Sequence, residues 1–294
     1  MQKYDFKAGI PPLILCLLMW GFQPLYWYIC PDNMDTLFLM VMRIVWAAVF
    51  CVAILAFQKK LPQLIAVFTD RNVLKREIPA SIFLAVDWLV YLFAVKNGKV
   101  QQTALGYYIM PLVLFLFGAL IFHEKFHWQY FIMLGLIIVG IIFSVGGFGE
   151  FPYVTLILAF AFAIYAALKK TLKVDSIVST TSEILIMVPF ALVYIIFSPA
   201  SRSTISAMAG TDWLFLLGAG VVTALPMLFY ALGIHNLPMM MCGLLEYFSP
   251  TFSFICSLIM GEGFNQDKLR SFLFIWAGVL LYIIYLLRRN PDKQ

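Results

Sequence analysis

Apolar residues occur in ten continuous runs of roughly 20 residues, and the short segments between the runs carry most of the charge. About 20 helical residues cross a hydrocarbon core ~30 Å thick. The runs do not alternate between apolar and polar positions, so helices are favoured over the strands of a membrane barrel. We predict spans at residues 9–29, 36–57, 79–97, 102–122, 129–147, 151–170, 179–197, 213–233, 239–260 and 270–287.

Two of these runs resemble each other. Leu105–Pro111 is followed 13 residues after the proline by Glu124, and Leu244–Pro250 is followed after 12 residues by Glu262. The two segments lie 139 residues apart in a chain of 294, which favours an internal repeat, although two apolar helices can also resemble each other by coincidence.

A unit of five spans begins and ends on opposite membrane faces, so two such units in tandem must lie upside down relative to each other. The sequence therefore predicts an all-α membrane protein of ten transmembrane helices, arranged as two inverted five-helix repeats. We place the repeats at residues 1–148 and 149–294. Inverted repeats are a common architecture of secondary transporters.

Composition excludes an ordinary soluble domain, because 63% of the residues are hydrophobic, 12% are charged and the mean hydropathy is +0.93. The net charge of +5 would suggest nucleic acid as a partner of a soluble protein, but here the basic residues lie between spans. One side of the predicted membrane collects 14 Lys and Arg residues and the other side 5. The richer side is expected to be cytoplasmic, with both termini on it.

Other local patterns predict no further chemistry. Lys3 and Lys7 precede the first span without a small-residue cleavage site, so we expect a retained helix and not a signal peptide. The five cysteines are scattered and are interpreted as packing residues, with no disulfide, metal or cofactor expected.

Three charged residues fall deep inside predicted spans: Arg43, Asp87 and Glu246. A charge at mid-membrane is costly, so each is a candidate functional residue. Asp87 either pairs with Arg43 or Lys96, or lies on a cavity wall where it binds a cation or takes up a proton. Glu246, beside Tyr247 and the Pro250 kink, fits the cavity interpretation better.

Several other span residues allow two interpretations. Glu183 lies near a span end and is expected to reach the interface. Trp27 is expected in an interfacial aromatic belt. Deeper aromatic residues can contact a ligand by stacking or cation–π interaction, or can simply pack: Trp20, Trp88, Tyr107, Tyr108 and Tyr165. Prolines inside spans bend helices and either line a cavity or form packed kinks: Pro111, Pro189, Pro226 and Pro250.

The segment His123-Glu124-Lys125-Phe126-His127 spells HExxH, the zinc-binding pattern of metalloproteases. It falls where a span exits the membrane, its glutamate has a repeat counterpart without flanking histidines, and the only other histidine is His235. An intramembrane zinc protease is therefore kept only as an alternative.

Several short segments follow one another in a defined order: Trp20-Gly21, Arg43, Asp87-Trp88, Ala94–Val100, Leu105–Pro111, Thr223–Met227 and Glu246–Thr251. Their order and spacing resemble the drug/metabolite transporter superfamily, and within it the RarD-like branch of the EamA family. This resemblance implies a cavity formed mainly by spans 1, 3, 4, 6, 8 and 9, alternating access, and a bacterial inner membrane. Two positions depart from the family pattern, since Asp87 replaces an asparagine and Glu246 replaces a glutamine, and each adds a carboxylate.

We therefore expect a secondary active transporter of a small amphipathic, amine-bearing metabolite or drug, with proton coupling as one possible mechanism and no enzymatic activity. Expected substrate contacts are Trp20, Asp87, Trp88, Tyr91, Tyr107, Tyr108, Tyr165 and Glu246. Arg43, Asp87 and Glu246 are expected to balance charge or couple transport, and the helices to bend at Gly106, Pro111, Pro226 and Pro250. The expected partners are the substrate, the lipid bilayer and protons, but no nucleic acid, for a monomer or homodimer. A non-transporting scaffold or complex subunit is the main alternative.

Overall fold

A computed structural model of the chain describes residues 4–31, 34–96, 100–124, 129–145 and 153–259, together with single residues between 270 and 284. Every regular element in this part of the chain is an α-helix. The helices are α1 (Phe6–Tyr28), α2 (Thr36–Phe57), α3 (Leu61–Thr69), α4 (Arg71–Lys96), α5 (Val100–Leu120), α6 (Gln129–Val145), α7 (Tyr153–Thr171), α8 (Ser176–Phe197), α9 (Pro199–Ala207), α10 (Gly210–Asn236), α11 (Met239–Leu245) and α12 (Phe248–Ile259).

Five of these helices are long and apolar enough to cross a membrane: α1, α2, α7, α8 and α10. The segment Gly106–Leu120 of α5 is a shorter apolar helix. The prediction of an all-α membrane protein is therefore confirmed.

Aspartate caps fix the start of three of the long helices. Asp35 Oδ1 accepts hydrogen bonds from the backbone N–H groups of Leu37 (2.8 Å) and Phe38 (3.0 Å) at the start of α2. Asp5 and Asp175 cap α1 and α8 in the same way. Each carboxylate satisfies N–H groups that have no partner inside the helix.

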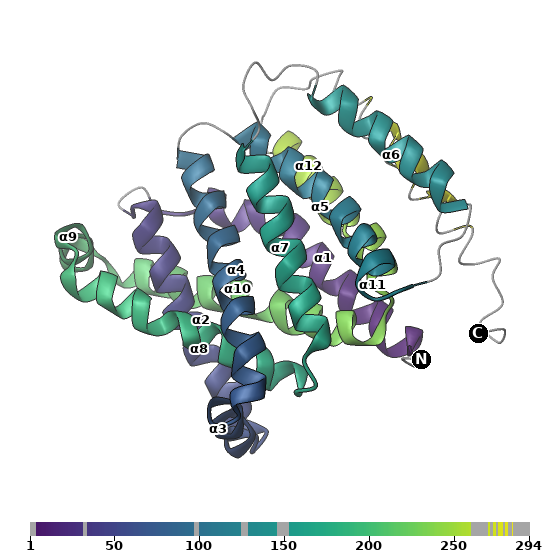
Figure 1. The fold of residues 1–294 in the computed structure, drawn as a ribbon. Helices are drawn as coiled ribbons and strands as arrows, with labels where there is room; N and C mark the ends of the chain where they lie inside the picture. Colours follow the sequence, from purple (N-terminus) through teal and green to yellow (C-terminus); the bar gives the residue numbers. More distant parts are fainter. Residues whose placement is uncertain are drawn as a thin grey trace.

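Helices from the first half of the chain pack against helices from the second half (Figure 1). Helix α1 packs against α10 and α12, and α7 packs against α4 and α5. Helices α2 and α8 contact each other, and α5 contacts α11. Gly220 lets α10 approach α2 closely, because a Cβ there would lie 2.6 Å from the carbonyl carbon of Trp46.

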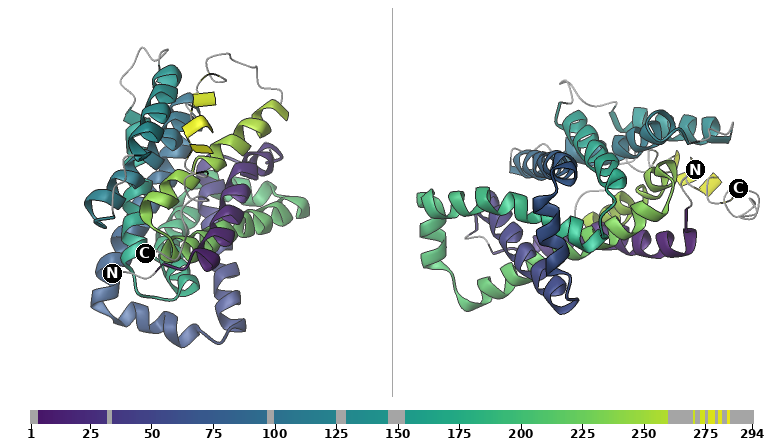
Figure 2. Two further views of the ribbon diagram at one scale, coloured as in Figure 1. Left: turned by 90° about the vertical axis from the view of Figure 1, so that its right-hand side faces the viewer. Right: turned by 60° about the horizontal axis from the view of Figure 1, so that its bottom comes forward.

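Two short helices, α3 and α9, lie at the periphery of the bundle (Figure 1, Figure 2). Each has 9 residues and begins with a proline in its first two positions, Pro62 and Pro199. Each follows a long helix, α2 or α8, and each precedes another, α4 or α10. Both segments were predicted as loops between spans.

The predicted span 239–260 is not one continuous helix. Helix α11 ends at Leu245 and α12 begins at Phe248, so Glu246 and Tyr247 lie in the break. Pro250 lies in the first turn of α12, where the missing N–H of proline breaks no helical hydrogen bond. The expected kink at Pro250 is therefore a full interruption four residues earlier.

One predicted loop boundary is also wrong, and two lysines at the end of the predicted span 151–170 are buried. Helix α7 continues to Thr171, so Lys169 and Lys170 lie inside it, where they are 0% and 4% exposed. Glu77, which was placed in the 58–78 loop, lies in the second turn of α4 and is fully buried.

Candidate functional site

Asp87 lies on α4 and is almost completely buried, with 2% of its surface exposed. The guanidinium group of Arg43 on α2 interacts with it electrostatically and stacks over the Trp88 ring, 4.5 Å from the ring centroid. The rings of Tyr91 and Tyr107 lie 6.0 Å apart and interact electrostatically with the same arginine. We call these five residues the Asp87 cluster.

The carboxylate of Asp87 is not neutralised by direct pairing. No ion pair joins Asp87 to Arg43 among the described residues, and Asp87 Oδ1 and Arg43 Nε both lack a hydrogen-bond partner. The interpretation of Asp87 as half of an ion pair with Arg43 is therefore wrong for this structure. The Trp27 ring also lies 5.7 Å from the Arg43 guanidinium, and its expected place in an interfacial belt stays a prediction. The side chain of Lys96 lies outside the described residues.

Glu246 lies in the break between α11 and α12 and is 1% exposed. Four aromatic side chains form a contiguous group near it. The Trp20 ring lies 5.3 Å from Tyr230 and 5.6 Å from Phe162, and the Tyr165 ring stacks on Tyr230 at 6.4 Å. We call these five residues the Glu246 cluster.

This second carboxylate also lacks a complete set of partners. Glu246 Oε1 and the Tyr230 hydroxyl oxygen have no hydrogen-bond partner, although the two residues interact electrostatically. The Cys16 thiol of α1 is a further electrostatic neighbour of Glu246. Buried polar atoms normally have a partner, so this cluster can accept a donor from outside the chain.

The two clusters lie apart. Among the described residues, no hydrogen bond or ion pair joins Asp87 to Glu246. Their aromatic rings nevertheless pack against one hydrophobic core, which includes Trp20, Trp88 and Tyr107. The predicted substrate-contact residues thus gather around two buried carboxylates and not around one.

The ring of Tyr108 belongs to the same hydrophobic core, and its expected contact with a substrate stays a prediction. Its ring is 6% exposed, and its backbone carbonyl accepts a hydrogen bond of 3.1 Å from the hydroxyl of Tyr247. This bond links α5 to the break in the second half of the chain, between the two residues that are equivalent in the predicted repeat.

Two of the predicted bending residues, Gly106 and Pro111, lie where α5 packs closely against other helices, and bending at these positions stays a prediction. A Cβ at Gly106 would lie 3.1 Å from Leu158, so the glycine brings α5 against α7. The carbonyl oxygen of Pro111 would lie 2.7 Å from a Cβ at Gly243, so α5 also approaches α11 closely. Pro226 lies inside α10, which continues without interruption from Gly210 to Asn236.

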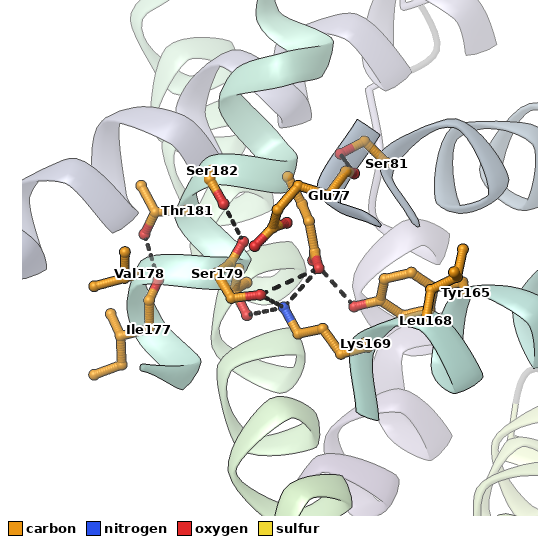
Figure 3. Close-up of polar contacts among 12 residues, drawn as sticks. Glu77, Ser81, Tyr165, Leu168, Lys169, Ile177, Val178, Ser179, Thr181 and Ser182 are labelled. Atoms are coloured by element: carbon orange, nitrogen blue, oxygen red, sulfur yellow. Dashed lines mark hydrogen bonds and ion pairs between the residues drawn. The ribbon is translucent and has the colours of Figure 1, made fainter. Parts of the chain in front are cut away.

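A third polar cluster was not predicted (Figure 3). Lys169 Nζ donates to Glu183 Oε1 at 2.8 Å, to Ser179 Oγ at 2.9 Å and to Thr180 Oγ1 at 3.0 Å. Glu77 points from α4 toward the same region of α8. Lys169, Glu183 and Glu77 are all 0% exposed, and we call these five residues the Lys169 cluster.

Glu183 was expected to reach the membrane interface, and this expectation is wrong. It is fully buried, paired with Lys169, and also accepts a 3.3 Å hydrogen bond from the Tyr165 hydroxyl. The sequence signal was the run Ser179–Glu183, five polar residues in succession inside an otherwise apolar span. Such a run needs buried partners.

Glu124 of the HExxH segment acts as a helix cap. Its carboxylate accepts hydrogen bonds from the backbone N–H groups of Met239 (2.5 Å) and Met240 (2.9 Å), at the start of α11. His123 has a positive φ of 51° and lies outside any helix, while His127 lies outside the described residues. Among the described residues no group of three metal-ligating side chains comes together. The zinc-protease alternative gains no support from this geometry.

Tyr4 and Lys170 complete the contacts around this cap. The Tyr4 hydroxyl donates to Glu124 at 3.3 Å, and the Lys170 ammonium lies 5.1 Å from the Tyr4 ring centroid. The pKa of Tyr4 is raised above its usual value, mainly because the side chain is partly buried and also because the negative charge of Glu124 lies close to it. Lys170 donates to the carbonyl oxygens of Ile234 and Leu237 at the end of α10.

Comparison with known proteins decides the family. Residues 7–146 match the model of the EamA-like transporter family. An uncharacterized transporter of Bacillus subtilis, YojE, is 34% identical over 287 residues, which cover 96% of this chain and 95% of that protein. The chain belongs to the EamA-like transporter family. As an EamA-like protein it is a membrane transporter with several spans, and the resemblance inferred from the sequence is confirmed.

Other relatives of this EamA-like transporter carry the name RarD. The RarD protein of Streptomyces exfoliatus is 30% identical and covers 90% of this chain and 84% of its own length. The RarD protein of Escherichia coli is 26% identical and covers 99% of each chain. A solved crystal structure has the same fold, with a TM-score of 0.75 at 16% identity over 98% of this chain and 100% of the other.

Proposed function

We propose that this EamA-like protein is a secondary active transporter that moves a small amphipathic, amine-bearing metabolite or drug by alternating access. One observation carries the proposal. Two carboxylates, Asp87 and Glu246, are buried in an apolar helix bundle, and each has an oxygen without a hydrogen-bond partner. An unpartnered buried charge is costly, and a cationic cargo would supply the missing partner.

The residues around the carboxylates suit such a cargo. Trp20 and Tyr230 beside Glu246, and Trp88 and Tyr107 beside Asp87, present aromatic surface for an apolar body. Aromatic faces also attract ammonium groups through cation–π interaction. Arg43 supports the same interpretation, because it already stacks on Trp88 and balances charge without pairing directly with Asp87.

The proposed transporter consists of two inverted five-helix repeats, residues 1–148 and 149–294. Packing supports this, because α1 contacts α10 and α12 while α7, its counterpart, contacts α4 and α5. The short helices α3 and α9 occupy equivalent places in the order of elements. Tyr247 donates to the carbonyl of Tyr108, its counterpart 139 residues earlier, as expected for residues beside a pseudo-twofold axis.

Alternating access would move helices of the bundle against one another. Two contacts join helices at the end that we assign to the cytoplasm: Glu124, which follows α5, binds the start of α11, and Lys170 of α7 binds the end of α10. Breaking them would open that end. The excess of Lys and Arg on this side supports a bacterial inner membrane with both termini in the cytoplasm.

The test is a screen of amines, amino acids and nucleosides for thermal stabilisation of the purified protein, because a ligand that binds only the folded state raises its apparent stability. A stabilising amine should lose its effect in Asp87→Asn or Glu246→Gln while those variants keep their own unfolding temperature. A non-transporting scaffold predicts the opposite result. No amine would stabilise the protein through Asp87 or Glu246, and Asp87→Asn and Glu246→Gln would only change the unfolding temperature.

A further inference from the structure

We propose that the Lys169 cluster is a proton-binding site, in which the carboxyl group of Glu77 takes up and releases the proton that drives transport. The binding of the proton stands on the cluster itself, whereas its coupling to a cargo rests on the proposed transport function. Asp87 and Glu246 are then left to recognise the substrate.

A count of hydrogen-bond donors shows that Glu77 is the residue of the Lys169 cluster whose side chain receives no hydrogen bond. An ammonium group has three N–H donors, and Lys169 directs all three to α8: to Ser179, Thr180 and Glu183. None is left for Glu77, whose two carboxylate oxygens are buried and find no hydrogen-bond partner.

The hydroxyl groups of Ser179 and Ser182 lie near Glu77 and interact with its carboxyl group electrostatically, but their hydrogen bonds go to other acceptors. The Ser179 hydroxyl donates to Glu183 at 3.4 Å, and the Ser182 hydroxyl donates to the backbone carbonyl of Ser179 at 2.8 Å. The Ser81 hydroxyl, one turn after Glu77, donates to the backbone carbonyl of Glu77 and not to its side chain. Glu77 therefore faces the cluster without receiving a hydrogen from it (Figure 3).

The net charge of the Lys169 cluster also favours a proton on Glu77. Lys169 and Glu183 neutralise each other at 2.8 Å, so an ionised Glu77 would add one uncompensated negative charge to a fully buried site. Such a charge is strongly disfavoured. One proton on Glu77 makes the cluster neutral, and its loss requires the site to open to water.

The other titratable groups around the cluster do not change this balance. Cys51 of α2 and Tyr165 of α7 are neutral neighbours of Lys169 and Glu183. His235 of α10 interacts electrostatically with Lys169 and with Lys170, whose own ammonium is directed to the carbonyl groups at the end of α10. No described group in contact with Glu77 offers a second positive charge.

A metal cation such as Na⁺ fits the cluster less well. Its natural oxygen ligands here, on Ser179, Thr180 and Glu183, are already occupied by the Lys169 ammonium. A second cation would also lie beside that ammonium. The proton is the one cation that Glu77 can bind without displacing Lys169.

Side-chain contacts connect this site to the Glu246 cluster. The Tyr165 hydroxyl donates to Glu183 at 3.3 Å, and its ring stacks on Tyr230, which interacts electrostatically with Glu246. A cargo that repositions Tyr165 or Tyr230 would therefore disturb the cluster that holds the proton, which gives a physical route for coupling.

Infrared spectroscopy of the purified protein over a pH series tests proton binding without any cargo. Wild type should show the carbonyl stretch of a protonated carboxylic acid that disappears at alkaline pH, and Glu77→Gln should lack this band. The band should persist in Asp87→Asn and Glu246→Gln, and adding Na⁺ should not move its titration. Identical spectra of wild type and Glu77→Gln at every pH would overturn the proposal.

Thermal unfolding gives a second measurement, which also shows that the variant folds. If folded Glu77 keeps a proton that the unfolded chain releases, stability falls as pH rises, by roughly a tenfold change in the unfolding equilibrium per pH unit. Glu77→Gln mimics the protonated form, so it should fold and lose this slope. An equal slope in both proteins would contradict a proton on Glu77.

Coupling is tested separately in proteoliposomes, with an amine that stabilises the protein. Glu77→Gln should keep exchange of labelled for unlabelled amine but lose the acceleration of net uptake by a pH gradient. If Glu77→Gln retains that acceleration, Glu77 does not couple transport. If no amine is transported by either protein, the transport function fails while the infrared result still decides proton binding.

Discussion

The carboxylate of Glu124 shows how one side chain can join distant parts of this chain. It follows α5 in sequence, yet it accepts hydrogen bonds from Met239 and Met240, more than a hundred residues away. Both donors belong to the unsatisfied N–H groups at the start of α11, and the negative charge also favours the positive end of the helix. The same residue thus caps α11 and ties its start to the end of α5.

Replacing Glu124 by alanine should lower the free energy of unfolding by about 1 to 2 kcal/mol, because two N–H groups lose a charged acceptor. Thermal unfolding of the purified variants measures this. His123→Asn is the matched control, since its side chain is exposed and asparagine tolerates the positive φ at this position. Equal stability of Glu124→Ala and the control would show that the cap contributes nothing.

Asp175 predicts a pH dependence outside the membrane. Its partial burial raises its pKa, but the hydrogen bonds from Lys60 and from the α8 backbone outweigh burial and leave the pKa below its usual value. Stability from this group is therefore complete above the unfolded pKa of about 3.9 and is lost as pH falls through the lower, folded value. Asp175→Asn should flatten the acid end of a stability–pH curve slightly, since the Lys60 pair is partly exposed. An unchanged curve would exclude Asp175 as the cause.

Lys169 and Lys170 explain why the sequence did not predict the third cluster. Both lie at the end of an apolar run, where lysines usually mark a cytoplasmic loop, and they were counted as such. Their hydrogen-bond acceptors lie on α8 and at the end of α10, so the local sequence does not indicate that the two lysine side chains are buried. Asp87 and Glu246 were predicted as deep charges because they interrupt apolar runs themselves.

Among the helices, the break between α11 and α12 is the least regular feature. Unwound backbone at membrane depth is tolerated where it is enclosed by protein or lines a cavity. Here it presents Glu246, and the Tyr247 hydroxyl ties the break to α5. The proline at 250 indicated an irregular helix, but proline alone did not predict where the interruption falls.

Helix positions were otherwise predictable from hydrophobicity. The predicted span 36–57 coincides with α2, and α10 exceeds the predicted 213–233 by three residues at each end. Helices α3 and α9 were not predicted, because segments of 9 residues are too short to cross a membrane. The predicted span 270–287 lies mostly outside the described residues.

The close contact between α2 and α10 depends on Gly220. Gly220→Val should destabilise the protein by about 1 to 3 kcal/mol, because the added atoms would overlap the backbone at Trp46 and Ala47. Gly135→Ala on α6 is the control, since a Cβ there meets nothing within 4 Å. Thermal unfolding of the two variants measures the difference, and an undisturbed Gly220→Val would mean that α2 and α10 do not pack in this way in the membrane.

Across the whole molecule, three buried polar clusters lie inside an apolar helix bundle. Each holds a carboxylate with an unpartnered oxygen, and the third also holds the Lys169 ammonium paired with Glu183. Family membership establishes a membrane transporter, and these clusters indicate where a cargo and a proton would bind.

Uptake of a stabilising amine into proteoliposomes is the most direct measurement of this function. Purified wild type should accumulate the amine with saturable kinetics, above protein-free vesicles. Glu246→Gln, shown to be folded by its unfolding temperature, should reduce the rate at low amine concentration at least tenfold, which is about 1.4 kcal/mol of lost binding. Equal uptake by wild type and Glu246→Gln, or uptake no faster than in empty vesicles, would contradict transport through a site built around this carboxylate.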